Sequence, residues 1–272
     1  MSAATATPNP AAPADPVATP LPAPIPDSYQ LFRRIVSPDS INQRQPSASQ
    51  AIYTAYVTTW LLVQQRLHGG ISLDEAVSNF LFTFPKEDLP DCKRLKDDSV
   101  SANSSGYCRA RQRLDPHLPV WLADHVFDSL YATCRPSWKN RRVMLLDGST
   151  FSLAPTKDLR EAFPPATNQY GPCHWPILQM VVAHDLDSGL VCRPQFGAMY
   201  GKDNESESSL TIELLPRLPP YSLILADGNF GIFNIAYAAT RQGTHDVLFH
   251  LSEARFRALL GRVDNCKGGT NN

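Results

Sequence analysis

Two short apolar runs, each leading into an Asp-Gly pair, constrain the fold of this chain more than any other feature. Residues 143–149 read VMLLDGS, and residues 223–231 read LILADGNFG. Each run has the length and aliphatic content of a buried β-strand, and its Asp follows at the carboxyl end. Ligands of open α/β sheets bind at the carboxyl ends of the strands. We therefore expect Asp147 and Asp227 to lie together at one edge of a sheet.

The two aspartates also have a simpler interpretation, because Asp-Gly is a common turn and either Asp alone could cap a turn or a helix. Two such pairs within one α/β unit favour a shared site instead. A carboxylate is costly to bury without cations, hydrogen bonds or a metal. Mg²⁺ prefers oxygen ligands and often uses one or two carboxylates together with substrate phosphate. The pattern thus predicts Asp147 and Asp227 as metal ligands.

Changes in composition along the sequence divide it into four segments. Residues 1–44 are predicted to be a disordered Pro/Ala-rich arm, because residues 1–27 are mostly Ala, Pro and Thr with little to bury. Residues 45–138 show apolar residues at helical spacing, together with a capping box in which Glu75 follows Ser72 by three positions. We interpret this segment as an all-helical domain, which a basic face on one of its helices would suit to binding DNA.

The third segment, residues 139–260, is predicted to form a mixed α/β sheet with flanking helices. Its strand candidates are VMLLD, ILQMVVAHD, LVCRPQFG, LILAD and DVLFHL, and its helix candidates are ESSLTIELLPRL and GIFNIAYAATRQG. Gly189 in HDLDSG predicts a hairpin turn that uses a positive φ. The fourth segment, residues 261–272, is polar and Gly-rich, and we expect a flexible tail.

Composition excludes some functions and leaves others open. The six cysteines form no CxxC pair, which argues against a zinc ribbon or a redox motif. No apolar run approaches the ~18 residues of a membrane span, so we expect no membrane partner. The net charge of −1 does not indicate a nucleic-acid partner, but a local basic face would be sufficient for one.

Four basic residues are candidate contacts for DNA phosphates. Arg109 and Arg113 are four residues apart and share one face of a predicted helix. Arg142 directly precedes the first strand, and Lys202 lies in a polar loop. The alternative for each is an ordinary solvated side chain.

Two aromatic residues, Trp175 and Phe196, could stack on nucleic-acid bases. We expect both to be core residues rather than stacking platforms.

A resemblance to a known family begins at the two Asp blocks. The segment LLDGSTFSLAPTKDLREAFPPATNQYGPCHWP resembles the first catalytic block of DDE transposases of the insertion-sequence-four type. The segment LLPRLPPYSLILADGNFG resembles the second block of that family, and SGYCRARQRL resembles a stretch of its helical N-terminal region. The resemblance covers roughly residues 45–260.

The resemblance implies an RNase H-like catalytic domain that performs phosphoryl transfer on DNA. It implies two metal ions, Mg²⁺ or Mn²⁺, with Asp147 bridging both ions and Asp227 binding one of them. The implied partners are double-stranded DNA, namely the terminal repeats of an insertion sequence and the target DNA, and a second copy of the chain in a homodimer. The implied location is the bacterial cytoplasm, at the nucleoid.

The sequence departs from the family at the third acidic residue. The family carries a Glu in a Tyr-x2-Arg-x3-Glu-x6-Lys signature, which this sequence lacks. Glu253 follows the last predicted strand, but it has no Tyr and Arg at the required offsets. We therefore expect a truncated or frameshifted copy with weak or absent strand transfer, the alternative for the C-terminus being a natural flexible end.

Two other functions fit part of the same pattern. A DNA-binding transposase remnant without catalysis, acting as an inhibitor of transposition, would need only the helical domain. A haloacid dehalogenase-type phosphatase would use Asp147 as a nucleophile. That class carries a second acidic residue two positions later, where this chain has Ser149, which argues against it.

Overall fold

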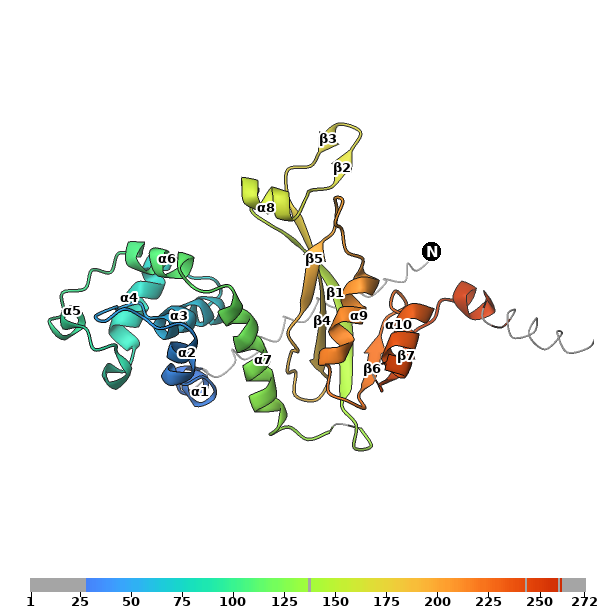
Figure 1. Ribbon diagram of the computed structural model, residues 1–272, viewed down its shortest axis with the longest axis horizontal. Coiled ribbons are helices and arrows are strands. Elements are labelled where there is room, and N and C mark those ends of the chain that lie inside the picture. The colour runs from blue at the N-terminus through green and yellow to red at the C-terminus, as the bar shows by residue number, and fades with distance from the viewer. Residues whose placement is uncertain (1–27, 137, 243, 259, 261–272) are drawn as a thin grey trace, which may run out of the picture.

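The computed structural model describes residues 28–258 and 260, apart from residues 137 and 243. A group of helices forms one side of the molecule, and a sheet with its own helices forms the other (Figure 1). Helix α7 (His117–Tyr131) lies between these two units. No helix within the described ranges is both long and apolar enough to cross a membrane.

The helical unit confirms the helices expected between residues 45 and 138. The hydroxyl of Ser72 accepts a hydrogen bond from the N–H of Glu75 (3.1 Å), as the predicted capping box requires. The remaining helices of this unit are α1 (Ser28–Ile35), α2 (Pro38–Arg44), α3 (Ala55–Leu67), α4 (Leu73–Thr83), the 3₁₀ turn η1 (Lys86–Asp88), α5 (Lys93–Lys96) and α6 (Ser105–Gln112).

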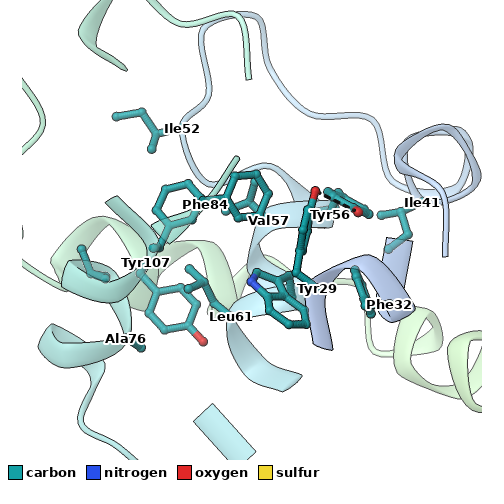
Figure 2. Close-up of a cluster of buried hydrophobic side chains, with 14 of the residues drawn as sticks. Tyr29, Phe32, Ile41, Ile52, Tyr56, Val57, Leu61, Ala76, Phe84 and Tyr107 are labelled. Carbon is teal, nitrogen blue, oxygen red and sulfur yellow. Dashed lines mark hydrogen bonds between the residues drawn. The ribbon is translucent and has the colours of Figure 1, made fainter. Parts of the chain in front are cut away.

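The predicted arm at residues 1–44 is wrong in its second part, because residues 28–44 form helices α1 and α2. Tyr29, Phe32 and Ile41 are buried in the core of the helical unit, beside Tyr56 of α3 (Figure 2). Burial of these side chains offsets the entropy of ordering the segment. The rest of the predicted arm, and the predicted tail at 261–272, lie outside the described residues.

Helix α7 contributes to both hydrophobic cores. Its first half packs on the helical core through Leu118 and Trp121, whereas Phe127 and Tyr131 pack on the core of the sheet unit. The ring Nε2 of His125 lies 2.9 Å from the carbonyl oxygen of Ile35 in α1. The predicted boundary at residue 138 therefore follows a helix that both units share.

A mixed sheet of five strands forms the centre of the second unit, as the α/β class predicted. The strand order is β5-β4-β1-β6-β7. Strand β1 pairs antiparallel with β4, and β4 with β5, whereas β1, β6 and β7 run parallel. The bounds are β1 Val143–Ser152, β4 Ile177–Asp185, β5 Gln195–Ala198, β6 Leu223–Ala226 and β7 Asp246–Phe249. Gly189, in the turn between β4 and β5, has the predicted positive φ of 70°.

The connections between strands carry the remaining elements. Between β1 and β4 the chain forms α8 (Lys157–Ala162) and a small hairpin of β2 (Thr167–Asn168) and β3 (Gly171–Pro172). Helix α9 (Glu207–Leu214) and the 3₁₀ turn η2 (Leu215–Arg217) lead into β6. Helix α10 (Phe233–Tyr237) and the π-helical η3 (Ala238–Gln242) lead into β7.

The two faces of the sheet differ in burial. Met144 and Leu146 of β1 are buried in a core that also contains Leu210 and Leu214 of α9. Leu145 and Asp147 point to the opposite face, because successive side chains alternate along a strand. On that face Leu145 is the register partner of Leu225, and Leu225 is the partner of Leu248, which is 61% exposed. We call this second side the open face of the sheet.

The expectation that Trp175 and Phe196 are core residues is wrong, since they are 52% and 55% exposed. Phe196 pairs with Met180, which pairs with Ser149, so all three lie on the open face. Trp175 lies two residues before β4, where the small hairpin leaves the sheet. We predicted burial because both side chains are aromatic, but residue type does not show which face of the sheet is covered by helices.

Candidate functional site

Asp147 and Asp227 lie at the same edge of two adjacent strands. The parallel pairing of β1 with β6 ends at Leu146 and Ala226, and each aspartate is the next residue. Strand β6 ends there as expected, but β1 continues to Ser152 in its antiparallel pairing with β4. The predicted adjacency is thus confirmed, while Asp147 is an internal residue of its strand rather than its last one.

Both carboxylates are exposed and are held by short-range backbone hydrogen bonds. Oδ1 of Asp147 accepts from the N–H of Gly148 (2.8 Å), and Oδ1 of Asp227 accepts from the N–H of Asn229 (2.8 Å). Among the residues that the structure describes, no Lys, Arg or His forms an ion pair with either aspartate. The pair therefore presents negative charge and free oxygen lone pairs at the sheet edge.

A third carboxyl group, that of Glu207, lies next to Gly148 on the α9 side of the sheet and was missed from the sequence. Glu207 is the first residue of α9, and its side chain fills the space next to Gly148. A Cβ atom at position 148 would overlap its Oε1 and lie 2.7 Å from its carboxyl carbon. Partial burial, followed by the negative charges of Asp227 and Asp147, raises the pKa of Glu207 above its ordinary value.

In the sequence, Glu207 looks like an ordinary acidic residue in the first turn of a helix, where the helix dipole favours it. One signal in the sequence could have indicated that another group packs next to Asp147. A glycine inside an apolar strand often marks a close approach by another group, and Gly148 follows the first aspartate directly.

A second residue missed from the sequence is His250, one position beyond β7. Its N–H donates to the carbonyl oxygen of Ala226 (3.4 Å), which extends the β6–β7 ladder past the last paired residues. A Cβ atom at Gly228 would lie 3.2 Å from the carbonyl oxygen of His250 and 3.4 Å from its Nδ1. The imidazole therefore lies beside the residue that follows Asp227.

The turn interpretation of the Asp-Gly pairs holds for Asp227 and not for Asp147. The carboxylate of Asp227 accepts the N–H of Asn229 at a turn of residues 228–230, whereas Asp147 lies within β1. Neither Gly148 nor Gly228 has a positive φ, so neither is required for a left-handed turn. Instead, each leaves room for a side chain from elsewhere, Glu207 at Gly148 and His250 at Gly228. The Asp-Gly pairs are thus points of close packing at the sheet edge.

A shallow groove of about 510 Å³ runs along this edge on the open face. The side chains of Asp147, Asp227 and His250 belong to its wall. The other residues that line it are Leu145, Leu146, Leu225, Ala226, Leu248 and Phe249. Three polar residues thus border an apolar floor.

The donor set suits a divalent cation that is completed by other ligands. Within the described ranges, no group of three or more His, Cys, Asp and Glu side chains is arranged to hold a metal ion by itself. Two exposed carboxylates do match the way Mg²⁺ binds, through one or two protein ligands plus water and substrate phosphate. Asp147 and Asp227 therefore fit the predicted Mg²⁺ or Mn²⁺ in a site that the substrate completes.

The predicted phosphate contacts divide into exposed and buried residues. Arg109 and Arg113 are exposed on and just after α6, and Lys202 is exposed in the loop before α9. Arg142 is only 7% exposed, so its guanidinium is not available for the predicted contact with a DNA phosphate. Its guanidinium donates to the carbonyl oxygens of Tyr131 (3.2 Å) and Cys134, at the end of α7.

Arg142 also lies 3.6 Å from the buried carboxylate of Asp185. Burial opposes ionisation of Asp185, but hydrogen bonds from Ser188 and Asp187 and the charge of Arg142 outweigh it and lower its pKa. Arg142 is thus a structural residue that connects α7 to the sheet.

Glu253 takes no part in this site. It is exposed, and its Oε1 accepts a hydrogen bond from Arg257 four residues later (2.6 Å). The neighbouring Arg255 is closer to the second aspartate, because its guanidinium donates to the carbonyl oxygen of Gly228.

Comparisons with known proteins do not place the chain in a family. No protein-family model matches the sequence, and no curated protein matches it. A solved structure, described as a cryo-EM structure of the simian T-cell lymphotropic virus intasome in complex with PP2A regulatory subunit B56 gamma, contains a similar chain with 17% identity. The match covers 50% of this chain and 46% of that chain, with a TM-score of 0.27, so this chain spans under half of its length.

Proposed function

We propose that this chain catalyses metal-dependent phosphoryl transfer on DNA, with Asp147 and Asp227 as its central acidic residues. The observation that carries the proposal is the position of the two carboxylates. Each follows the last paired residue of one of two adjacent parallel strands, and no described cationic side chain pairs with either. The resemblance of both Asp blocks to DDE transposases supplies the reaction class.

An RNase H-like fold is part of the same proposal. Its support is the strand order β5-β4-β1-β6-β7, in which β5, β4 and β1 are antiparallel and β1, β6 and β7 are parallel. This arrangement brings the first aspartate, on the central strand, next to the second aspartate on the neighbouring parallel strand. The resemblance predicts the same order of acidic residues along the chain.

The described side chains suggest a role for each group at the edge. A bound divalent ion would stabilise the charge that develops on the attacking and leaving oxygens of the phosphoryl group. Asp147 and Asp227 would hold the ion, and the backbone N–H groups of Gly148 and Asn229 orient their carboxylates. Glu207 adds negative charge behind Gly148, which strengthens attraction for a cation at the edge.

A plasmid-nicking assay tests this proposal. Purified protein with Mn²⁺ should convert supercoiled plasmid to the nicked form, and Asp147→Asn or Asp227→Asn should lower the rate by at least on the order of 100-fold. Asp187→Asn, a change in the exposed turn after β4, is the matched control and should leave the rate unchanged. Calorimetric titration with Mn²⁺ in the presence of duplex DNA should show weaker binding for the two site variants only.

Nicking that needs no metal, or that survives both substitutions, would contradict the proposal. DNA binding without nicking by the unchanged protein would favour the second candidate, a non-catalytic transposase remnant that binds DNA through its helical unit. The exposed Arg109 and Arg113 favour that alternative. The nicking assay reports strand cleavage, and we expect strand transfer by this chain to be weak or absent.

A further inference from the structure

We propose that the β2–β3 hairpin is a nucleic-acid contact in which Tyr170 stacks on an unpaired base of the substrate strand. This inference rests on the proposed function, since it places the same DNA along the molecule. The hairpin extends from the sheet on the side to which β1 runs, above the top of β5 in Figure 1. The hairpin contributes no residue to the groove beside Asp147 and Asp227.

Tyr170 is held outward at the tip of the hairpin. Its side chain is 89% exposed, the most exposed large hydrophobic side chain among the described residues. Oδ1 of Asn168 accepts the N–H of Tyr170 (2.9 Å), and Gly171 has a φ of 109°, a conformation that favours glycine. The turn thus fixes the backbone that presents the ring.

The base of the hairpin is tied to the sheet unit. The guanidinium of Arg160 in α8 donates to the carbonyl oxygens of His174 and Cys173 (3.4 Å for the latter). The N–H of Leu153, just after β1, donates to the carbonyl oxygen of Pro176, just before β4 (2.9 Å). An exposed ring on an anchored loop loses little conformational entropy when it binds, which favours a binding role over a solvated loop.

Strand β1 connects the hairpin with the acidic edge, by which we mean the sheet edge that carries Asp147 and Asp227. Asp147 and Phe151 lie on the open face of β1, because they are four residues apart. Phe151 is 47% exposed, and it is separated from Asp147 by about 13 Å of strand. At about 3.4 Å per nucleotide of one strand, a chain that starts at the carboxylates reaches Phe151 after roughly four nucleotides. The β2–β3 hairpin lies beyond the end of β1 (Figure 1).

The chemistry of the hairpin favours bases over phosphates. Residues 162–184 contain no Lys, Arg, Asp or Glu, so the hairpin offers no charged group for the DNA backbone. An aromatic ring stacks on any base, because every base has a π-face. Trp175, at the foot of the hairpin and 52% exposed, provides a second ring on the same route. An uncharged hairpin with an exposed ring is suited to holding an unpaired base away from the reacting phosphate.

Photocrosslinking and binding measurements test the inference on the full-length protein. The probe is a duplex with a single-stranded extension that carries 5-iodouracil at successive positions, and its affinity is measured by fluorescence anisotropy. Tyr170 should crosslink to a position at least four nucleotides from the junction. Tyr170→Ala should weaken binding by about 5- to 150-fold, whereas Tyr170→Phe, which keeps the ring, should retain the affinity.

The control is Phe82→Ala, which removes another highly exposed ring, on α4 and away from the sheet. It should leave the affinity unchanged. Equal affinities for the unchanged protein, Tyr170→Ala and Phe82→Ala would overturn the hairpin contact alone, because the dependence of nicking on Asp147 would be unaffected. Loss of nicking in Tyr170→Ala at saturating DNA, with affinity intact, would also overturn the stacking role. No binding of the probe by the unchanged protein would overturn both proposals.

Discussion

Gly148 and Glu207 occupy one space: the carboxyl group of Glu207 lies where a side chain at position 148 would be. This contact connects the start of α9 to the residue after Asp147. It explains why the first apolar run continues into glycine although β1 does not turn there. The acidic edge thus depends on a residue without a side chain as much as on the residues with carboxylates.

Substitution of Gly148 by Ala should therefore displace Glu207. The displaced atoms are the far end of a flexible side chain, so we expect a loss of stability at the low end of the about 1–3 kcal/mol seen at overpacked sites, together with reduced nicking. Gly228→Ala should cost at least as much, because the nearest atom, at 3.2 Å, is the backbone carbonyl oxygen of His250, which cannot rotate away. Denaturant unfolding of both variants measures the difference. A Gly148→Ala/Glu207→Ala double variant should recover stability but not activity, and unchanged stability of Gly148→Ala would contradict the contact.

Replacement of Glu207 by Gln should separate stability from function. Because the pKa of Glu207 is raised in the folded state, its contribution is fully present below the ordinary pKa and is lost as the pH rises through the folded value. At neutral pH the Gln variant should thus be more stable than the parent, and the two should converge at low pH. Thermal melting from pH 4 to pH 8 measures this, and a gap that does not vary with pH would refute it. Nicking by the variant should decrease.

The pair formed by Arg142 and Asp185 should matter for folding and not for DNA affinity. Removing one partner of a buried pair leaves the other charge uncompensated, so Arg142→Met should cost about 3–5 kcal/mol. Asp185→Asn should also destabilise the fold at neutral pH. Because the pKa of Asp185 is lowered, its contribution is present above the ordinary pKa and is lost as the pH falls through the folded value. Urea unfolding at pH 7 and pH 3 should show the difference shrinking in acid.

Arg109 and Arg113, on and just after α6, should matter for DNA affinity and not for folding. Arg109→Gln and Arg113→Gln should leave stability unchanged and weaken DNA binding at low salt. Each lost phosphate contact should reduce the slope of log affinity against log salt by about 1. Anisotropy titrations between 50 and 200 mM salt measure the slope, with Arg66→Gln, in the last turn of α3, as a control of equal charge. Equal slopes for all the variants would assign these arginines to a solvated surface.

Much of the architecture could be predicted from local sequence patterns. Strand β4 has the bounds of the run ILQMVVAHD, and the capping hydroxyl of Ser72 begins α4 as its sequence indicated. The adjacency of Asp147 and Asp227 also followed from their positions after apolar runs. These features depend on local propensity and on a general rule of α/β sheets, so a single sequence contains them.

Other features depend on contacts between distant residues and could not be predicted in this way. Residues 28–44 are helical because Tyr29 and Phe32 bury against α3, whereas the preceding Pro-rich composition suggested an arm. Arg142 looked like a surface cation until Asp185 was placed beside it by β4. Glu207 and His250 acquire meaning only once Gly148 and Gly228 are seen to accommodate them.

The pairing of β1 with β4 has a consequence for folding itself. Asp147 lies within a ladder of nine paired residues, opposite Val182. Side chains alternate between faces, so a slip of one residue along this ladder would carry the aspartate under α9 and bring an apolar neighbour to the groove. A chain trapped in that register would form every strand, but Asp147 would not lie on the open face beside the groove. Correct alignment of two long strands is therefore a step on which the activity depends before any ligand arrives.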